Sequence, residues 1–152
     1  MPAIVRNAVL ICIAAACAAA DAHDDVIDVL TSMAGALSET GDRAVTRTAN
    51  VSKFMSAFSK DMPDYDTLAN NVTALVDSAD ISSSILPLTE DGNDQMYKID
   101  LDWLLEIRSL EPDGPLVRRR EVVHCELRKE KKKWKVVALK PIEFFAAANL
   151  GK

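Results

Sequence analysis

Hydrophobic residues recur at helical spacing in the first half of the chain. Three stretches, Asp25 to Leu37, Val51 to Phe58 and Tyr65 to Val76, each place their apolar side chains on one face of a helix. Gly41 and Met62-Pro63 separate them. The pattern predicts three helices with one buried face each, formed by Val26, Leu30, Met33 and Leu37, by Val51, Phe54, Met55 and Phe58, and by Tyr65, Leu68, Val72, Leu75 and Val76.

After Ala79 the hydrophobic period changes to two. The stretch from Tyr97 to Ile107 alternates apolar and polar residues, which is typical of a strand with one buried face. Ile81 to Leu88 predicts a shorter strand, irregular or at a sheet edge because it contains Pro87. Leu116 to Lys129 and Lys132 to Leu139 complete an antiparallel sheet of about four strands.

The turn Glu111 to Pro115 suggests a register for the central hairpin. If Leu110 faces Leu116, Trp103 faces Val123, Asp102 faces His124 and Glu106 faces Arg120. If Glu130-Lys131 forms the next loop, Leu127 faces Trp134, Cys125 faces Val136 and Val123 faces Ala138. Both hairpins then place their apolar residues on one face, which we expect the helices to cover. The predicted fold class is α+β.

Several segments resemble the NTF2-like (nuclear transport factor 2 fold) superfamily. They are the three N-terminal helices, the Pro63-Asp64-Tyr65-Asp66 helix start, the segment RRREVVHCEL and the final WKVVALKPIEFF. The resemblance covers residues 23 to 146 and is nearest to exported bacterial members. It implies a cone of three helices on a curved sheet, often homodimeric through the outer sheet face. Members include isomerases, cyclases and non-catalytic binding modules, so the fold does not select a function.

Inside the cone, polar residues are few. Trp103, Arg119 and Glu121 are the candidates for binding a small ligand at the pocket mouth. Alternatively, Arg119 and Glu121 pair with each other or turn to solvent at a bulge. Cys125 is expected to be a buried, inert thiol.

The outer sheet face combines apolar residues with charges. We expect a homodimer interface formed by Leu104, Val122, His124, Val137 and Leu139. The Asp102–His124 pair could be a general-base dyad, but a stabilising cross-strand pair is the simpler interpretation.

The N-terminus has the pattern of an export signal. Arg6 precedes the apolar run Ala8 to Ala20, and small residues allow cleavage after Ala20 or Ala22. The alternative is a buried N-terminal helix. We expect residues 1–22 to be a signal peptide, residues 23–152 to form one domain, and the protein to be secreted or periplasmic. The run is too short for a transmembrane span, and a lipid anchor at Cys17 is not expected.

Few residues suggest a metal or cofactor. There is no zinc-type Cys/His spacing and no Gly-rich phosphate loop, so no cofactor is expected. Cleavage after Ala20 would leave Asp21-Ala22-His23 as the N-terminus, a nitrogen site for Cu(II) or Ni(II) at His23. The basic runs near residues 119 and 132 do not predict nucleic-acid binding, because the net charge is −5.

These patterns favour a binding protein. We expect an exported domain that binds a small apolar or amphipathic ligand or a partner protein without catalysis. The alternative is an isomerase, cyclase or hydratase acting in the cone, which would need an acid–base group there.

Overall fold

The computed structural model describes residues 21–38 and 43–151. The predicted export signal falls almost entirely on residues 1–20, outside this part of the chain. A first helix occupies residues 21–36. It is followed by α2 (Arg43–Met55), α3 (Tyr65–Ser78), β1 (Ala79–Gly92), β2 (Met96–Ser109), β3 (Leu116–Glu130), β4 (Lys133–Lys140) and the short 3-10 helix η1 (Ile142–Phe145).

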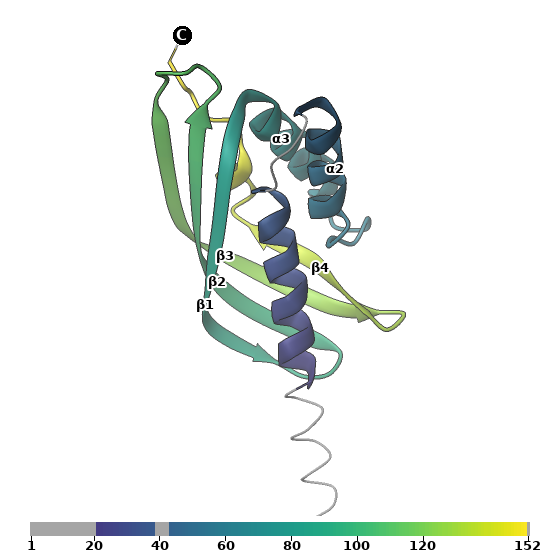
Figure 1. The fold of residues 1–152 in the computed structure, drawn as a ribbon. Coiled ribbons are helices and arrows are strands. Elements are labelled where there is room, and N and C mark those ends of the chain that lie inside the picture. The colour runs from purple at the N-terminus through teal and green to yellow at the C-terminus, as the bar shows by residue number, and fades with distance from the viewer. Residues whose placement is uncertain (1–20, 39–42, 152) are drawn as a thin grey trace, which may run out of the picture.

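The four strands form one antiparallel sheet in the order β1-β2-β3-β4. The long strands bend along their length, and all the helices lie on the concave side (Figure 1). The predicted α+β architecture is therefore confirmed. None of the helices in the described ranges is both long and apolar enough to cross a membrane.

The helical faces predicted from the sequence lie in the core. Val26, Leu30 and Met33 of the first helix and Leu68 and Val72 of α3 are at most 1% exposed. The inward side chains of β2 meet them, from Ile99 through Ile107. The core thus forms where the period-3.6 faces of the helices pack on the period-2 face of the sheet.

The register of the central hairpin differs from the predicted one by two residues. Leu101 pairs with Val123, and Trp103 pairs with Glu121. Pairing ends at Arg108 and Leu116, and the longer turn is closed by a hydrogen bond from the Ser109 N–H to the Pro115 carbonyl (3.0 Å). A shift of two residues keeps every side chain on its predicted face, so the predicted core survives the error.

The β3–β4 hairpin was predicted incorrectly in two ways. Its tip is Lys131-Lys132, with positive φ at both residues (48° and 70°), so Glu130 pairs with Lys133. Farther along, Leu127 pairs with Val136 but Glu126 pairs with Ala138, which leaves Val137 as the extra residue of a β-bulge. The bulge reverses the alternation, so Leu139 points inward and is 2% exposed. Its predicted place on the outer face is wrong.

Candidate functional site

The centre of the cone is filled by aromatic rings. Trp103 and Phe145 are both 0% exposed, and their rings meet edge to face with centroids 4.9 Å apart. The ring of Phe145 also contacts those of Phe144 and Phe54, with centroids 5.1 Å and 5.5 Å away. The indole Nε1 of Trp103 donates to Ser83 Oγ at 2.9 Å. Trp103 is therefore a core residue here, and its predicted role at a pocket mouth stays a prediction.

Arg119 binds the C-terminal segment that follows β4. Its Nη1 donates to the carbonyl oxygens of Phe144 (3.0 Å) and Ala146. Burial lowers the pKa of the guanidinium from its ordinary value. The alternative, an Arg119–Glu121 ion pair, does not form; the Nη1 of Arg119 donates to the main-chain carbonyls of Phe144 and Ala146. Arg119 thus has internal partners, and its predicted role in ligand binding stays a prediction.

Glu121 lies at the edge of the sheet. Glu121 pairs with Trp103 and lies on the same inward face of the sheet. It is nevertheless exposed, because β4 ends at Lys140, opposite His124, and leaves Glu121 without a neighbouring strand on that side. It lines a surface hollow of about 600 Å³ together with Arg119, Pro141, Glu143 and Phe144. The two predicted polar residues share this hollow, whereas Trp103 does not line it.

Cys125 is buried as predicted, with 2% exposure. Its neighbours across the sheet are Ile99 and Leu139, not the predicted Leu101 and Val136. Burial, with a smaller contribution from the charge of Asp100, raises the thiol pKa to about 12. Such a thiol is neutral at ordinary pH and a poor nucleophile.

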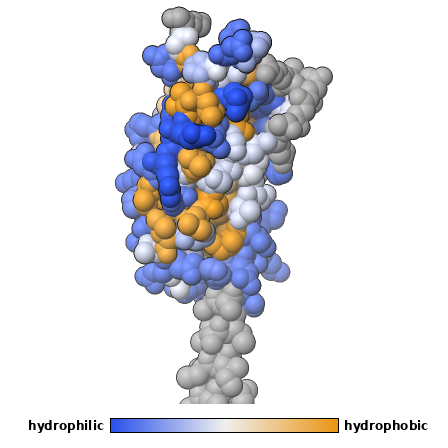
Figure 2. Space-filling view, turned by 60° about the vertical axis from the view of Figure 1, so that its left-hand side comes forward, coloured by the Kyte–Doolittle hydropathy of each residue, from blue (hydrophilic) through white to orange (hydrophobic). Residues whose placement is uncertain are grey.

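The outer sheet face carries exposed apolar side chains between ion pairs. Val122 is 41% exposed, Leu104 and Val137 are half-buried, and Leu86 on the edge strand is 60% exposed. Figure 2 shows hydrophobic groups on this side of the molecule, interrupted by strongly hydrophilic residues. Four of the five predicted interface residues (Leu104, Val122, His124 and Val137) lie outside the core.

His124 has a carboxylate partner on the outer face, but not the predicted one. Its Nδ1 lies 2.6 Å from Asp100 Oδ1, and Thr89 Oγ1 donates to the other oxygen of that carboxylate at 2.9 Å. These hydrogen bonds, the one from His124 first, lower the pKa of Asp100. Asp102 instead accepts a two-pronged contact from Arg120, and Glu106 pairs with Arg118. The shifted register explains all three changes. His124 forms a cross-strand pair, the kind of interaction predicted for it, but with Asp100 instead of Asp102.

A second cluster joins the first helix to the sheet. His23 Nδ1 lies 2.9 Å from Glu90 Oε2 and 3.2 Å from the Tyr97 hydroxyl. Burial, followed by the charge of Glu90, raises the pKa of Tyr97. Within the described residues no three His, Cys, Asp or Glu side chains converge as a metal site. The N-terminal copper or nickel site at His23 would have to displace the Glu90 contact.

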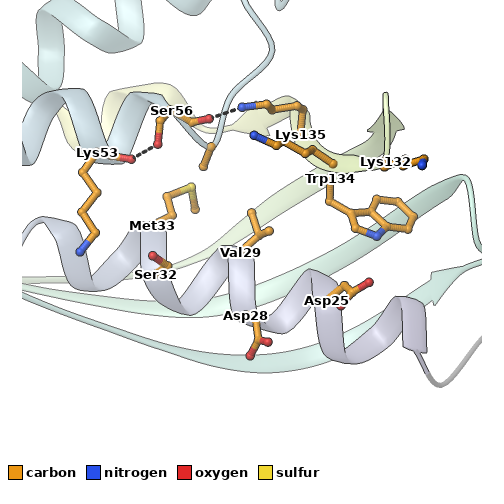
Figure 3. Close-up of a pocket in the computed structure, with 12 residues that line it drawn as sticks. Asp25, Asp28, Val29, Ser32, Met33, Lys53, Ser56, Lys132, Trp134 and Lys135 are labelled. Atoms are coloured by element: carbon orange, nitrogen blue, oxygen red, sulfur yellow. Dashed lines mark hydrogen bonds between the residues drawn. The ribbon is translucent and has the colours of Figure 1, made fainter.

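The sequence analysis missed a groove of about 490 Å³. It lies between the first helix, the end of α2 and the β3–β4 hairpin (Figure 3). The lining residues are Asp25, Asp28, Val29, Ser32, Met33, Lys53, Ser56, Ala57, Lys132, Lys133, Trp134 and Lys135. In the sequence, the basic run near residue 132 was considered only as a signal for nucleic-acid binding.

The hairpin that forms one wall of the groove is fixed to the end of α2. The Val136 N–H donates to the Ala57 carbonyl (2.8 Å), and the Ser59 N–H donates to the Val136 carbonyl (2.9 Å). Lys135 Nζ also donates to the Ser56 carbonyl at 2.5 Å. The groove is therefore held open by main-chain hydrogen bonds between segments about eighty residues apart in the sequence.

Solved structures with the same arrangement identify the fold. A protein assigned as an aromatic ring hydroxylase from Novosphingobium aromaticivorans is 12% identical, with a TM-score of 0.60 over 78% of this chain and 86% of its own. An NTF-2-like protein of unknown function from Shewanella oneidensis is 9% identical, with a TM-score of 0.51 over 77% and 95%. The chain has the NTF2-like fold.

Other comparisons do not narrow the function. A hexachlorocyclohexane dehydrochlorinase also has the NTF2-like fold, at 13% identity and a TM-score of 0.56 over 77% of this chain and 81% of its own. No family model matches the chain, and no curated protein matches it in sequence. At such low identity the shared NTF2-like fold carries no activity from one protein to another.

Proposed function

We propose that this chain is an exported NTF2-like domain that acts by binding, without catalysis, and assembles as a homodimer through its outer sheet face. One observation carries the non-catalytic part. Trp103 and Phe145 meet at 4.9 Å in the centre of the cone and are shielded from solvent. A substrate would have to displace packed rings, which is costly in a close-packed interior.

The enzyme alternative would rest on His23, Glu90 and Tyr97. The side chains of His23 and Glu90 are 41% and 40% exposed, so water screens the pair and the groups lack a dry setting. Cys125 places a thiol inside the cone, but its pKa of about 12 makes it unsuited to nucleophilic attack. We therefore favour binding over an isomerase, cyclase or hydratase activity.

Assembly through the outer face is supported by its composition. Val122 and Leu104 lie in the middle of the sheet with ion pairs on either side, including Asp102–Arg120 and Asp100–His124. An exposed apolar centre within a polar rim is the usual anatomy of an interface. Leu86 and Leu88, 60% and 49% exposed, extend the apolar area to the edge strand.

Export is supported by the sequence pattern, and the fold favours one cleavage position. Ala22 is 5% exposed and belongs to the core cluster. Cleavage after Ala20 keeps this residue in the mature protein, whereas cleavage after Ala22 removes it. We therefore favour cleavage after Ala20, which leaves a mature chain that begins with Asp21-Ala22-His23.

Native mass spectrometry of the protein purified from its own host tests this proposal. We expect a dimer whose chains begin at Asp21. Val122→Arg should give monomers, because it would bury a guanidinium charge in the apolar centre of the interface, while Thr67→Arg on α3 should remain dimeric. A monomeric wild-type protein, a Val122→Arg dimer as stable as the wild type, or a chain that retains residues 1–20 would contradict the proposal.

A further inference from the structure

We propose that the groove between the first helix and the β3–β4 hairpin binds short peptides with free ends. Such a ligand carries an ammonium group, a carboxylate, apolar side chains and main-chain carbonyls. The inference gives a ligand class to the proposed binding role and rests on that role. It concerns a surface away from both the cone centre and the outer sheet face.

The groove holds opposite charges on opposite walls. Asp25 and Asp28 project from the first helix, and Lys132 lies on the hairpin (Figure 3). Lys133, the first residue of β4, also lines the groove. All four side chains are exposed, and neither aspartate forms an ion pair with either lysine, all of them within the described ranges. A ligand with a positive and a negative end can satisfy both walls at once, whereas a ligand of a single charge is repelled by one of them.

Between the charged walls lies an apolar floor. Val29 and Met33 contribute from the helix, Ala57 from the segment after α2 and Trp134 from β4. A volume of about 490 Å³ lies within the range of small-ligand pockets and suits a few amino-acid residues. Apolar peptide side chains would therefore be placed on this floor, between the two charged ends.

The indole of Trp134 favours a peptide over a single amino acid. Trp134 is 5% exposed, and its Nε1 has no hydrogen-bond partner in the described structure. Figure 3 shows the indole extending from β4 toward the first helix, with its nitrogen on the side of Asp25. A buried donor without an acceptor costs free energy. A main-chain carbonyl inside a peptide supplies the missing acceptor once a side chain of the groove wall turns aside.

A titration of ¹⁵N-labelled full-length protein with tri-leucine tests the inference. The chain has two tryptophans, and Trp134→Phe assigns their indole signals. We expect the Trp134 signal to move on titration. The Trp103 signal should not, because that N–H is already bonded to Ser83 in the core. Capping either end of the peptide should weaken binding roughly tenfold, the usual scale for losing one charged contact.

Matched variants assign each end of the peptide. Asp28→Asn should bind free and N-acetylated tri-leucine equally well, while still distinguishing the C-terminal amide. Lys133→Gln should bind free and C-amidated tri-leucine equally well, while still distinguishing the N-acetylated peptide. Asp113→Asn, which changes an exposed residue in the β2–β3 turn, should behave as wild type. An unmoved Trp134 signal, or equal binding of the doubly capped peptide, would overturn the inference. If the protein is a dimer that binds no peptide, only the peptide-binding inference is contradicted. If it is a monomer that binds peptide, only the proposed homodimer is contradicted.

Discussion

The rings of Trp103 and Phe145 meet edge to face, 4.9 Å between centroids and 82° apart in plane, at the centre of the cone. Trp103 comes from the middle of the sheet and Phe145 from the C-terminal 3-10 helix, so the last turn of the chain closes the core around them. Because of this contact, we interpret the interior of the cone as a packed core that stabilises the fold.

Removing the Phe145 ring should destabilise the fold strongly. Phe145→Ala leaves a cavity beside Trp103 and Phe54, and such a change costs about 3–5 kcal/mol in a packed core. Urea unfolding followed by tryptophan fluorescence measures the loss. Glu143→Ala in the same short helix is exposed and should lose far less. Equal stability of the two variants would mean that Phe145 is not part of the core.

Arg119 should hold the C-terminal segment in place. Arg119→Met keeps the aliphatic stem but removes the donors to Phe144 O and Ala146 O, and hydrogen bonds from charged groups are worth about 1.5–3 kcal/mol. Amide hydrogen exchange of residues 142–150 should accelerate in this variant. Arg118→Met is the control, because its exposed pair with Glu106 is worth about 0–1 kcal/mol. Unchanged exchange in Arg119→Met would contradict this role.

The His124–Asp100 pair should make stability depend on acidic pH. The pKa of Asp100 in the folded chain lies below its ordinary value, so the carboxylate stabilises the fold above the normal carboxyl pKa of about 3.9. This contribution is lost as the pH falls through the lowered value. We expect Asp100→Asn to flatten the acid limb of a plot of Tm against pH, and Asp94→Asn to leave it unchanged. Identical limbs in all three proteins would rule the effect out.

Cys125 should be unreactive in the folded protein. With a pKa of about 12 and 2% exposure, it presents almost no thiolate at pH 8. Ellman's reagent should label it only on unfolding in urea, at the same midpoint as the fluorescence change. The effect of Cys125 on the pH dependence of stability is opposite to that of Asp100. Because its pKa is raised in the folded chain, Cys125 favours the fold at low pH, and this contribution is lost at high pH, where the thiol of the unfolded chain ionises. Fast labelling without denaturant would show that the thiol is accessible.

The sequence predicted buried faces better than it predicted partners. Val26, Leu30, Leu101 and Cys125 are buried as expected, because helical and strand periods depend only on local spacing. The partner of His124 is Asp100 instead of Asp102, because turn length sets the register and a slip of two residues leaves the faces unchanged. Leu139 was misplaced because the bulge at Val137 has no clear local signal.

The sites depend on contacts between distant segments. Arg119 binds main-chain carbonyls, which any residue would supply, so nothing in the sequence of η1 identifies its partner. The groove joins residues near 28, 56 and 134. Asp25 and Asp28 beside an apolar helix face were the available signal, but their position opposite Lys132 and Lys133 follows only from the fold.

The most direct test of the closed cone is hydrogen exchange at the Trp103 indole N–H, measured by NMR at increasing concentrations of denaturant. If the cone is a packed core, this proton exchanges only when the whole chain unfolds. Its exchange free energy should then fall with denaturant at the slope of global unfolding. Fast exchange that is independent of denaturant would mean that the cone opens locally to water, and would contradict the assignment of a non-catalytic binding domain.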